Sequence, residues 1–174
     1  MKELLEGLLP RIMPELSFTC IPHEGKQDLE KSIPRKLRAW NVPGDVFVII
    51  RDQDSGDCKD IKRKIAGICL ECGTGRKYHI RIACHELEAW YFGEPAAIAR
   101  AFNNDKLAKI GRKKPYRIPD AIKQPSKELA KLIPEFQKVS GAKRMAQHLS
   151  REGNESRSFQ VLIECLSKEC QATC

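Results

Sequence analysis

The stretch VFVIIRDQDSGDC, residues 46–58, joins a run of apolar residues directly to a cluster of acids. The run Val46–Ile50 is continuous, as is typical of a strand covered on both faces of a parallel sheet. Asp52, Asp54 and Asp57 follow within a few positions. The stretch therefore predicts a buried strand that delivers carboxylates to one edge of a sheet.

Helical and strand patterns alternate on both sides of this stretch. Apolar residues recur at helical spacing in some segments, and short apolar runs separate these segments. The expected elements are a helix at 2–13, a strand at 17–22, a helix at 28–40, a strand at 46–51, a helix at 55–72, a strand at 78–84 and a helix that begins near residue 85. Such alternation favours an α/β fold with a mostly parallel sheet flanked by helices.

The C-terminal part differs, because residues 94–174 hold helical patterns only, joined by polar and basic loops. The loop KIGRKKPYR, residues 109–117, is the most basic of these. We therefore expect an α/β core over residues 1–104 and a helical extension over residues 105–174, packed on the same domain.

The helix expected at residues 2–13 has an apolar face that a sheet should cover. In a βαβ arrangement a strand would precede such a helix. We therefore expect either a small sheet or one that lacks its first strand. An open sheet edge of this kind would favour a homodimer.

Composition narrows the class of protein. No window approaches the roughly 20 apolar residues that a membrane span needs, and the formal net charge is +8. A basic balance favours DNA or RNA as a partner, although many soluble proteins are basic without binding nucleic acid. Eight cysteines without a secretory signal favour reduced thiols. We expect a cytoplasmic protein with no membrane partner.

The pair Asp52 and Asp54 forms a DxD sequence at a strand end. Alternate residues of an extended chain point the same way, so both carboxylates can face one point. Two close carboxylates repel unless a cation or a proton lies between them. Oxygen ligands suit Mg²⁺ or Mn²⁺, which serve phosphodiester chemistry. The alternative is that Asp54, Ser55 and Asp57 only cap the helix that follows.

Two more acids, Glu86 and Glu88, follow the strand expected at 78–84. If both were helical, they would lie about 200° apart around the axis. We therefore expect Glu86 to face the site as a metal ligand or general base. Glu88 is then expected to face solvent or a basic partner, and stays a further candidate ligand.

Basic residues near these acids are candidates for phosphate binding. Arg51 precedes the DxD sequence, Lys59 opens the next helix, and Lys26 stands two residues after Glu24. An acid followed at this spacing by a lysine occurs in many metal-dependent nucleases, although the match alone carries little information. We expect Arg51, Lys26 and Lys59 to contact the substrate.

Four stretches together resemble one bacterial family, domain of unknown function 4276, which belongs with the Toprim-like domains. The resemblance covers nearly the whole chain and rests on GKQDLEKSIPRKLRAW (25–40), RDQDSGDC (51–58), RIACHELEAWYFG (81–93) and NESRSF (154–159). It implies a Toprim-like fold, in which a DxD sequence and a glutamate after the first strand hold Mg²⁺ for phosphoryl transfer on nucleic acid.

Carried onto this chain, the DxD corresponds to Asp52 and Asp54, and Glu86 and Glu88 match an acidic pair of the family. The glutamate of the first strand has no match, since Glu3 and Glu6 fall in the first expected helix. Related Toprim-like proteins occur beside ATPases in phage-defence loci, so an ATPase partner and a role in phage defence are implied by analogy.

Two functions remain open at this point. The first is a Mg²⁺- or Mn²⁺-dependent nuclease or other phosphoryl-transfer enzyme that acts on DNA or RNA. The second is a module without catalysis that binds nucleic acid or a partner ATPase and has an incomplete metal site. The first requires a divalent ion, whereas the second predicts salt-dependent binding without one.

Overall fold

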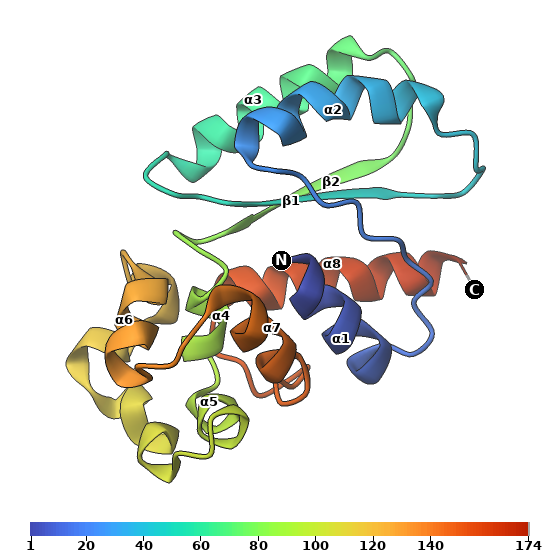
Figure 1. Cartoon of the computed structure of the whole chain (residues 1–174). Coiled ribbons are helices and arrows are strands. Elements are labelled where there is room, and N and C mark those ends of the chain that lie inside the picture. Colours follow the sequence, from blue (N-terminus) through green and yellow to red (C-terminus); the bar gives the residue numbers. More distant parts are fainter. Residues whose placement is uncertain (174) are drawn as a thin grey trace.

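The computed structural model describes residues 1–173 and has mixed α/β architecture (Figure 1). The elements in order are α1 (Lys2–Ile12), α2 (Lys26–Ala39), β1 (Phe47–Asp52), α3 (Cys58–Glu71), β2 (Tyr78–Ala83), α4 (Ala89–Phe92), α5 (Pro95–Ala101), the 3₁₀ helices η1 (Asp105–Arg112), η2 (Lys114–Tyr116) and η3 (Pro119–Ala121), then α6 (Pro125–Leu132), α7 (Lys138–Ala146) and α8 (Arg157–Thr173).

The sheet within the described residues has two strands, β1 and β2, which pair in parallel from Phe47 opposite Tyr78 to Asp52 opposite Ala83. This confirms the two later strand predictions to within one residue. The two carboxyl ends therefore lie side by side, as the sequence analysis requires for a shared site.

The strand expected at residues 17–22 is wrong. These residues form an irregular segment between α1 and α2, and none of their backbone N–H groups donates to another described backbone carbonyl. Alternation of apolar residues favours an extended chain, but a strand also needs a neighbour with which to pair. Among the described residues the segment has no such neighbour, and a groove of about 1000 Å³ that is also lined by β1 lies beside it.

The groove follows from an open edge of β1. Phe47 N–H donates to Lys77 O at 3.1 Å, and Gln53 N–H donates to Ala83 O at 2.9 Å. Because the direction of the backbone groups alternates along a strand, Val48, Ile50 and Asp52 direct theirs toward the opposite edge. No described strand pairs there.

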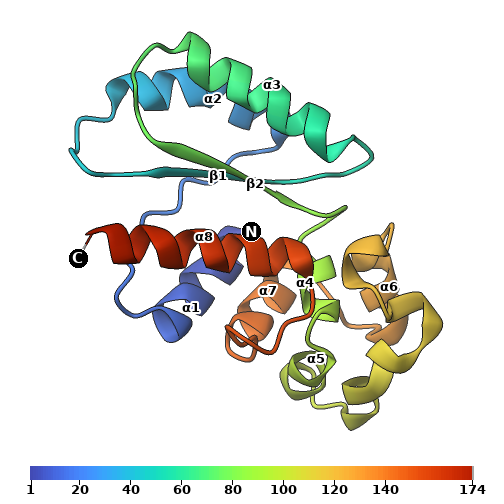
Figure 2. The same ribbon diagram turned by 180° about the vertical axis from the view of Figure 1, so that it is seen from behind.

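Helices cover the two faces of the sheet in separate layers. Helices α2 and α3 lie on one face, and α8 and α1 lie on the other, as both views show (Figures 1 and 2). Phe47 and Ile49 pack with the first pair of helices, whereas Val48 and Ile50 pack toward the second. The side-chain alternation of β1 thus supplies both layers, which explains its continuous apolar run.

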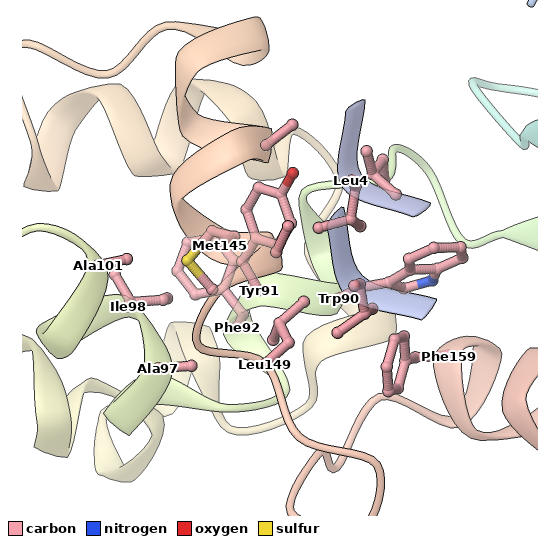
Figure 3. Close-up of a cluster of buried hydrophobic side chains, with 14 of the residues drawn as sticks. Leu4, Trp90, Tyr91, Phe92, Ala97, Ile98, Ala101, Met145, Leu149 and Phe159 are labelled. Carbon is pink, nitrogen blue, oxygen red and sulfur yellow. The ribbon is translucent and has the colours of Figure 1, made fainter. Parts of the chain in front are cut away.

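The larger core joins the two ends of the chain. Helix α1 packs against α7, and Leu4 and Leu8 share one buried cluster with Met145 and Leu149. Figure 3 shows the centre of this cluster, where Leu4 lies among Trp90, Tyr91 and Met145. Residues 1–104 and 105–173 therefore share this core, because helices from both parts of the chain pack together.

No helix in the part of the chain that the structure describes is both long enough and apolar enough to cross a membrane.

Candidate active site at the carboxyl ends of the strands

The two strand ends are fastened to each other by backbone and side-chain hydrogen bonds. Beyond β1, Asp54 N–H donates to His85 O at 2.8 Å. The side chain of Gln53 accepts from His85 N–H at 3.1 Å and donates to Gly56 O at 2.8 Å. Asp54 and His85 both adopt a φ of 56°, which is uncommon for residues other than glycine. Gln53, the middle residue of the DxD sequence, thus holds the two turns together.

Asp52 is the last residue of β1, and its carboxylate lies in a poorly solvated position. Its Oδ1 is buried and accepts no hydrogen bond within the described residues. Burial raises the pKa of Asp52 to about 6, and the Asp54 charge adds to this, against lowering effects from the Met1 amino group, the Leu87 N–H and Lys138. A buried carboxylate with an unsatisfied oxygen is costly to maintain.

Glu88 is the most buried acid near Asp52, with 3% of its surface exposed. Burial raises its pKa, and the charges of Glu86 and Asp52 act in the same direction, whereas Lys138 opposes them. Glu88 therefore lies close enough to Glu86 and to Asp52 for the charges of both to act on it.

A lysine from the C-terminal part meets this acidic group. Lys138 Nζ, at the start of α7, lies 3.1 Å from Glu86 Oε1 and 3.9 Å from Glu88 Oε1. Burial acts to lower the pKa of Lys138, but the charges of Glu88, Glu86 and Asp52 raise it overall. The Lys138 ammonium group thus lies near two carboxylates, those of Glu86 and Glu88, and the charge of Asp52 also acts on it.

Glu86 has the most hydrogen bonds of the three. Its Oε2 accepts from Ser126 N–H at 2.9 Å, and its Oε1 accepts from Lys138. Burial alone would raise its pKa, but the hydrogen bonds from Ser126 and Lys138 lower it.

The helical placement expected of Glu86 and Glu88 is therefore wrong, although Glu88 does lie near a basic partner, Lys138. Both residues precede α4, which begins only at Ala89, so the helical geometry behind that expectation does not apply. Turns at residues 84–88 allow both side chains to reach Lys138, and Glu88 is the one that lies deeper.

Tyr91 closes the buried side of this group. It is fully buried, and its hydroxyl oxygen has no hydrogen-bond partner among the described residues. Burial raises its pKa well above the usual value, and the charges of Glu88 and Asp52 add to the effect. Figure 3 shows the ring of Tyr91 inside the apolar cluster, with its oxygen turned away from Phe92.

The three basic residues expected to bind phosphate differ in how far they are already paired with acids. Arg51 is largely buried, donates to Glu30 Oε1 at 3.2 Å and lies 3.9 Å from Asp54 Oδ2. Lys26 is more exposed and lies 3.7 Å from Asp54 Oδ2. Lys59 is exposed in the first turn of α3. Arg51 is thus held in place by acids, whereas Lys26 and Lys59 face solvent.

The helix-cap interpretation applies to Asp57. Its Oδ1 accepts from Lys59 N–H at 2.7 Å and from Asp60 N–H at 3.1 Å, so it caps α3. Asp54 instead pairs with Lys26 and Arg51. Asp57 therefore caps a helix, whereas Asp54 does not. Asp54 lies close enough to Asp52 for its charge to raise the pKa of Asp52.

The side chains at this site have the oxygen donors that a divalent ion needs, but they do not form a complete set of metal ligands. The oxygen atoms of Asp52, Glu86 and Glu88 suit Mg²⁺ or Mn²⁺, and the unsatisfied Oδ1 of Asp52 is free to accept one. Within the described residues, however, no three His, Cys, Asp or Glu side chains converge closely enough to hold a metal. Mg²⁺ is usually held by one or two carboxylates plus waters and substrate phosphates, so a complete cage is not required.

Sequence reasoning missed Gln53, Tyr91 and Lys138. Tyr91 stands three residues after Glu88, a spacing that places two side chains on one helical face, and this signal was available. No local signal marks Lys138, because it lies about 50 positions from Glu86 and meets it only through tertiary packing.

The comparisons with known proteins give one match. A family model described as "Domain of unknown function (DUF4276)" matches residues 1–167. Neither the search of curated proteins nor the search of solved structures found a match to this chain.

Proposed function

The chain belongs to the DUF4276 family, and we propose that it is a Mg²⁺- or Mn²⁺-dependent phosphoryl-transfer protein that acts on nucleic acid, as a nuclease in the first instance. The observation that carries the proposal is the half-buried side chain of Asp52, whose Oδ1 is buried and unsatisfied and whose pKa is raised, close to the buried Glu88. Strongly perturbed carboxylates in a groove are typical of catalytic sites.

The residues have distinct parts in this proposal. Asp52 and Glu88 are the first candidates to hold the ion, and Asp54 and Glu86 lie beside them. The ion would supply Lewis-acid activation of a phosphate oxygen or of water. Glu86 is better suited to a further ligand than to a general base, because its lowered pKa makes it a weak base. Lys26 and Lys59 are placed to meet phosphates from solvent.

A Toprim-like assignment goes with this function. The parallel pair of β1 and β2, with acids after each strand, is compatible with it. The groove beside the open edge of β1 leaves room for the further strand that such a sheet would have. A cytoplasmic setting is compatible with the free thiols of Cys20, Cys58, Cys69, Cys72, Cys84 and Cys165. A role in phage defence and an ATPase partner follow from the family resemblance alone.

The direct test is calorimetric titration of Mn²⁺ into wild type and into an Asp52→Asn, Asp54→Asn double variant. We expect wild type to bind one ion and the double variant to bind none. Wild type should then cut labelled DNA or RNA with Mn²⁺ and not with EDTA, while the double variant should be inactive in both. Equal cutting by the two proteins would contradict the assignment.

A second prediction concerns Lys138, because its ammonium group lies beside the carboxylates of Glu86 and Glu88 and would repel a metal ion bound there. Replacing Lys138 with glutamine should tighten Mn²⁺ binding by about tenfold, or roughly 1.4 kcal/mol. Lys143→Gln is the matched control, because Lys143 lies on the same helix, pairs with Glu3 at 3.3 Å and is similarly exposed, at 64% against 60% for Lys138. Calorimetry on both variants separates a local effect from a change in net charge.

A module that binds without catalysis is the second candidate. It is favoured by the extent to which the acids are already paired, since Glu86 meets Ser126 and Lys138 while Asp54 meets Lys26 and Arg51. If the protein is such a module, wild type should not bind Mn²⁺, and the Lys138→Gln variant should not gain affinity for the metal.

A further inference from the structure

The positive charge of the chain is concentrated in one segment. Residues 105–127 carry eight lysines and arginines against two aspartates, a net charge of +6 out of +8 for the whole chain. One of the two acids, Asp120, accepts hydrogen bonds from Ser156 Oγ at 2.6 Å and Ser158 N–H at 2.7 Å. It therefore caps the start of α8 and does not neutralise the surface.

The cations of this segment are exposed and have no acidic partners. The six between residues 105 and 118 are all exposed, and none forms an ion pair within the described residues. They are Lys106, Lys109, Arg112, Lys113, Lys114 and Arg117. By contrast, Lys26, Arg51, Lys64 and Lys138 are all paired with carboxylates.

The 3₁₀ geometry of η1 arranges three of them in a row. A 3₁₀ helix has three residues per turn, so residues three apart are eclipsed. Leu107 and Ile110 form the inward row and are buried at 4% and 2% exposure. Lys106, Lys109 and Arg112 form an outward row with a spacing of about 6 Å, since each residue rises about 2.0 Å. A row of this kind matches a chain of phosphates better than it matches a single anion.

The segment is fixed to the frame that carries the candidate site. Tyr116 stacks on Phe92 of α4 with ring centroids 5.1 Å apart, and its hydroxyl donates to Glu128 of α6 at 3.0 Å. Ser126, at the start of α6, donates to Glu86. In Figures 1 and 2 the yellow segment lies beside α6, at the same end of the molecule as the carboxyl ends of the strands.

We infer that η1 and η2 form a surface that binds the phosphate backbone of a nucleic acid through the row Lys106, Lys109 and Arg112, with Lys113, Lys114 and Arg117 beside it. The inference rests on the proposed function for the identity of the polyanion, and it adds where the polyanion binds. A membrane surface is less well matched, because Ile118 is the one large apolar residue strongly exposed within residues 105–127.

The test compares two variants that lose the same charge. In the row variant, Lys106, Lys109 and Arg112 are replaced by glutamine. In the control, Lys31, Arg35 and Arg38 are replaced by glutamine; these residues are exposed on α2, which covers the opposite face of the sheet from α8. The anisotropy of a labelled DNA single strand and of its duplex is measured in EDTA over a range of KCl concentrations, after circular dichroism has confirmed folding.

The row variant should bind DNA about tenfold more weakly than wild type, and its plot of log K against log [salt] should be shallower by roughly two to three units. The control should stay within about twofold of wild type. Equal losses in both variants, no loss in the row variant, or no DNA binding by wild type would each overturn the inference. Binding to phosphatidylserine vesicles that depends on the row while DNA binding does not would also overturn it.

Measurements on the same variants distinguish a failure of this inference from a failure of the proposed function. Because DNA binding is measured in EDTA, it does not depend on a metal. Titration of Mn²⁺ into the row variant should match wild type if the acidic site exists. If neither protein binds Mn²⁺ while the row variant still loses DNA affinity, the metal proposal fails and the binding surface stands.

Discussion

An Asp52→Asn variant is expected to be more stable than wild type at neutral pH when no metal is present. The folded protein raises the pKa of Asp52 to about 6 from an ordinary value of 3.8, chiefly by burial. The folded state therefore binds the proton more tightly than the unfolded state. The stabilising effect of protonation is complete below about pH 4 and is lost as the pH rises through about 6. Asparagine has no such dependence.

The size of the effect follows from the shift. A change from 3.8 to about 6 corresponds to roughly 3 kcal/mol between acid and neutral pH. The free energy of unfolding of the variant minus that of wild type should rise by about this amount between pH 3 and pH 7, and urea denaturation at several pH values in EDTA measures it. Asp60→Asn is the control for the loss of one surface carboxylate, since Asp60 is 68% exposed in the first turn of α3. A flat difference for Asp52→Asn would show that Asp52 is well solvated.

Metal should reverse the order of the two proteins. An ion that binds only the folded wild type stabilises it by RT ln(1 + [L]/Kd), about 4.1 kcal/mol at a thousandfold excess over Kd, which exceeds the roughly 3 kcal/mol expected between the two proteins. Added Mn²⁺ at pH 7 should therefore raise the stability of wild type and leave Asp52→Asn unchanged. If Mn²⁺ stabilised both equally, the ion would bind elsewhere.

Local patterns predicted the parts of the fold that local physics determines. The apolar run before Asp52 predicted β1 because a strand buried on two faces needs apolar side chains in succession. Its register against β2 brought Asp52 beside Ala83, and this placed the acids of both strand ends together. The failure at 17–22 has the same origin, because an extended pattern does not reveal whether a partner strand exists.

The composition of the site depended on tertiary packing. Glu86 and Glu88 were expected on opposite sides of a helix because a continuous helix was assumed from residue 85, whereas turns precede α4. Lys138 reaches the acids only because α7 packs on α1 and returns the chain to the strand ends. A single sequence gives the residue types at such a site, but it does not say which distant cation completes it.

Gly93 is the position where a small substitution should do the most damage. Its φ of −66° is open to any residue, so glycine is not needed there for backbone freedom. It is needed for space, because a Cβ atom would overlap Asn154 Oδ1 and lie 2.7 Å from Ser156 N. Gly93 O accepts from Glu155 N–H at 2.7 Å, and Asn154 donates to Trp90 O at 2.7 Å. The stretches ending in Gly93 and beginning at Asn154 are thus locked together by direct contact.

Gly93→Ala should therefore lower the free energy of unfolding by about 3–5 kcal/mol, since overpacking adds to the loss of buried hydrogen bonds. Gly67→Ala is the matched control, because no atom lies within 4 Å of its Cβ position in α3. That change should be neutral or stabilise by up to about 1 kcal/mol. Urea denaturation measures both.

A double variant, Gly93→Ala with Asn154→Ala, separates steric overlap from general disruption. Removing the Asn154 amide makes room for the new methyl group, so the double variant should lose clearly less stability than the sum of the two single losses, by at least about 1 kcal/mol. Strict additivity would show that Gly93 and Asn154 do not compete for the same space. The short distance between the Cβ position of residue 93 and Asn154 Oδ1 would then not explain why glycine is needed at position 93.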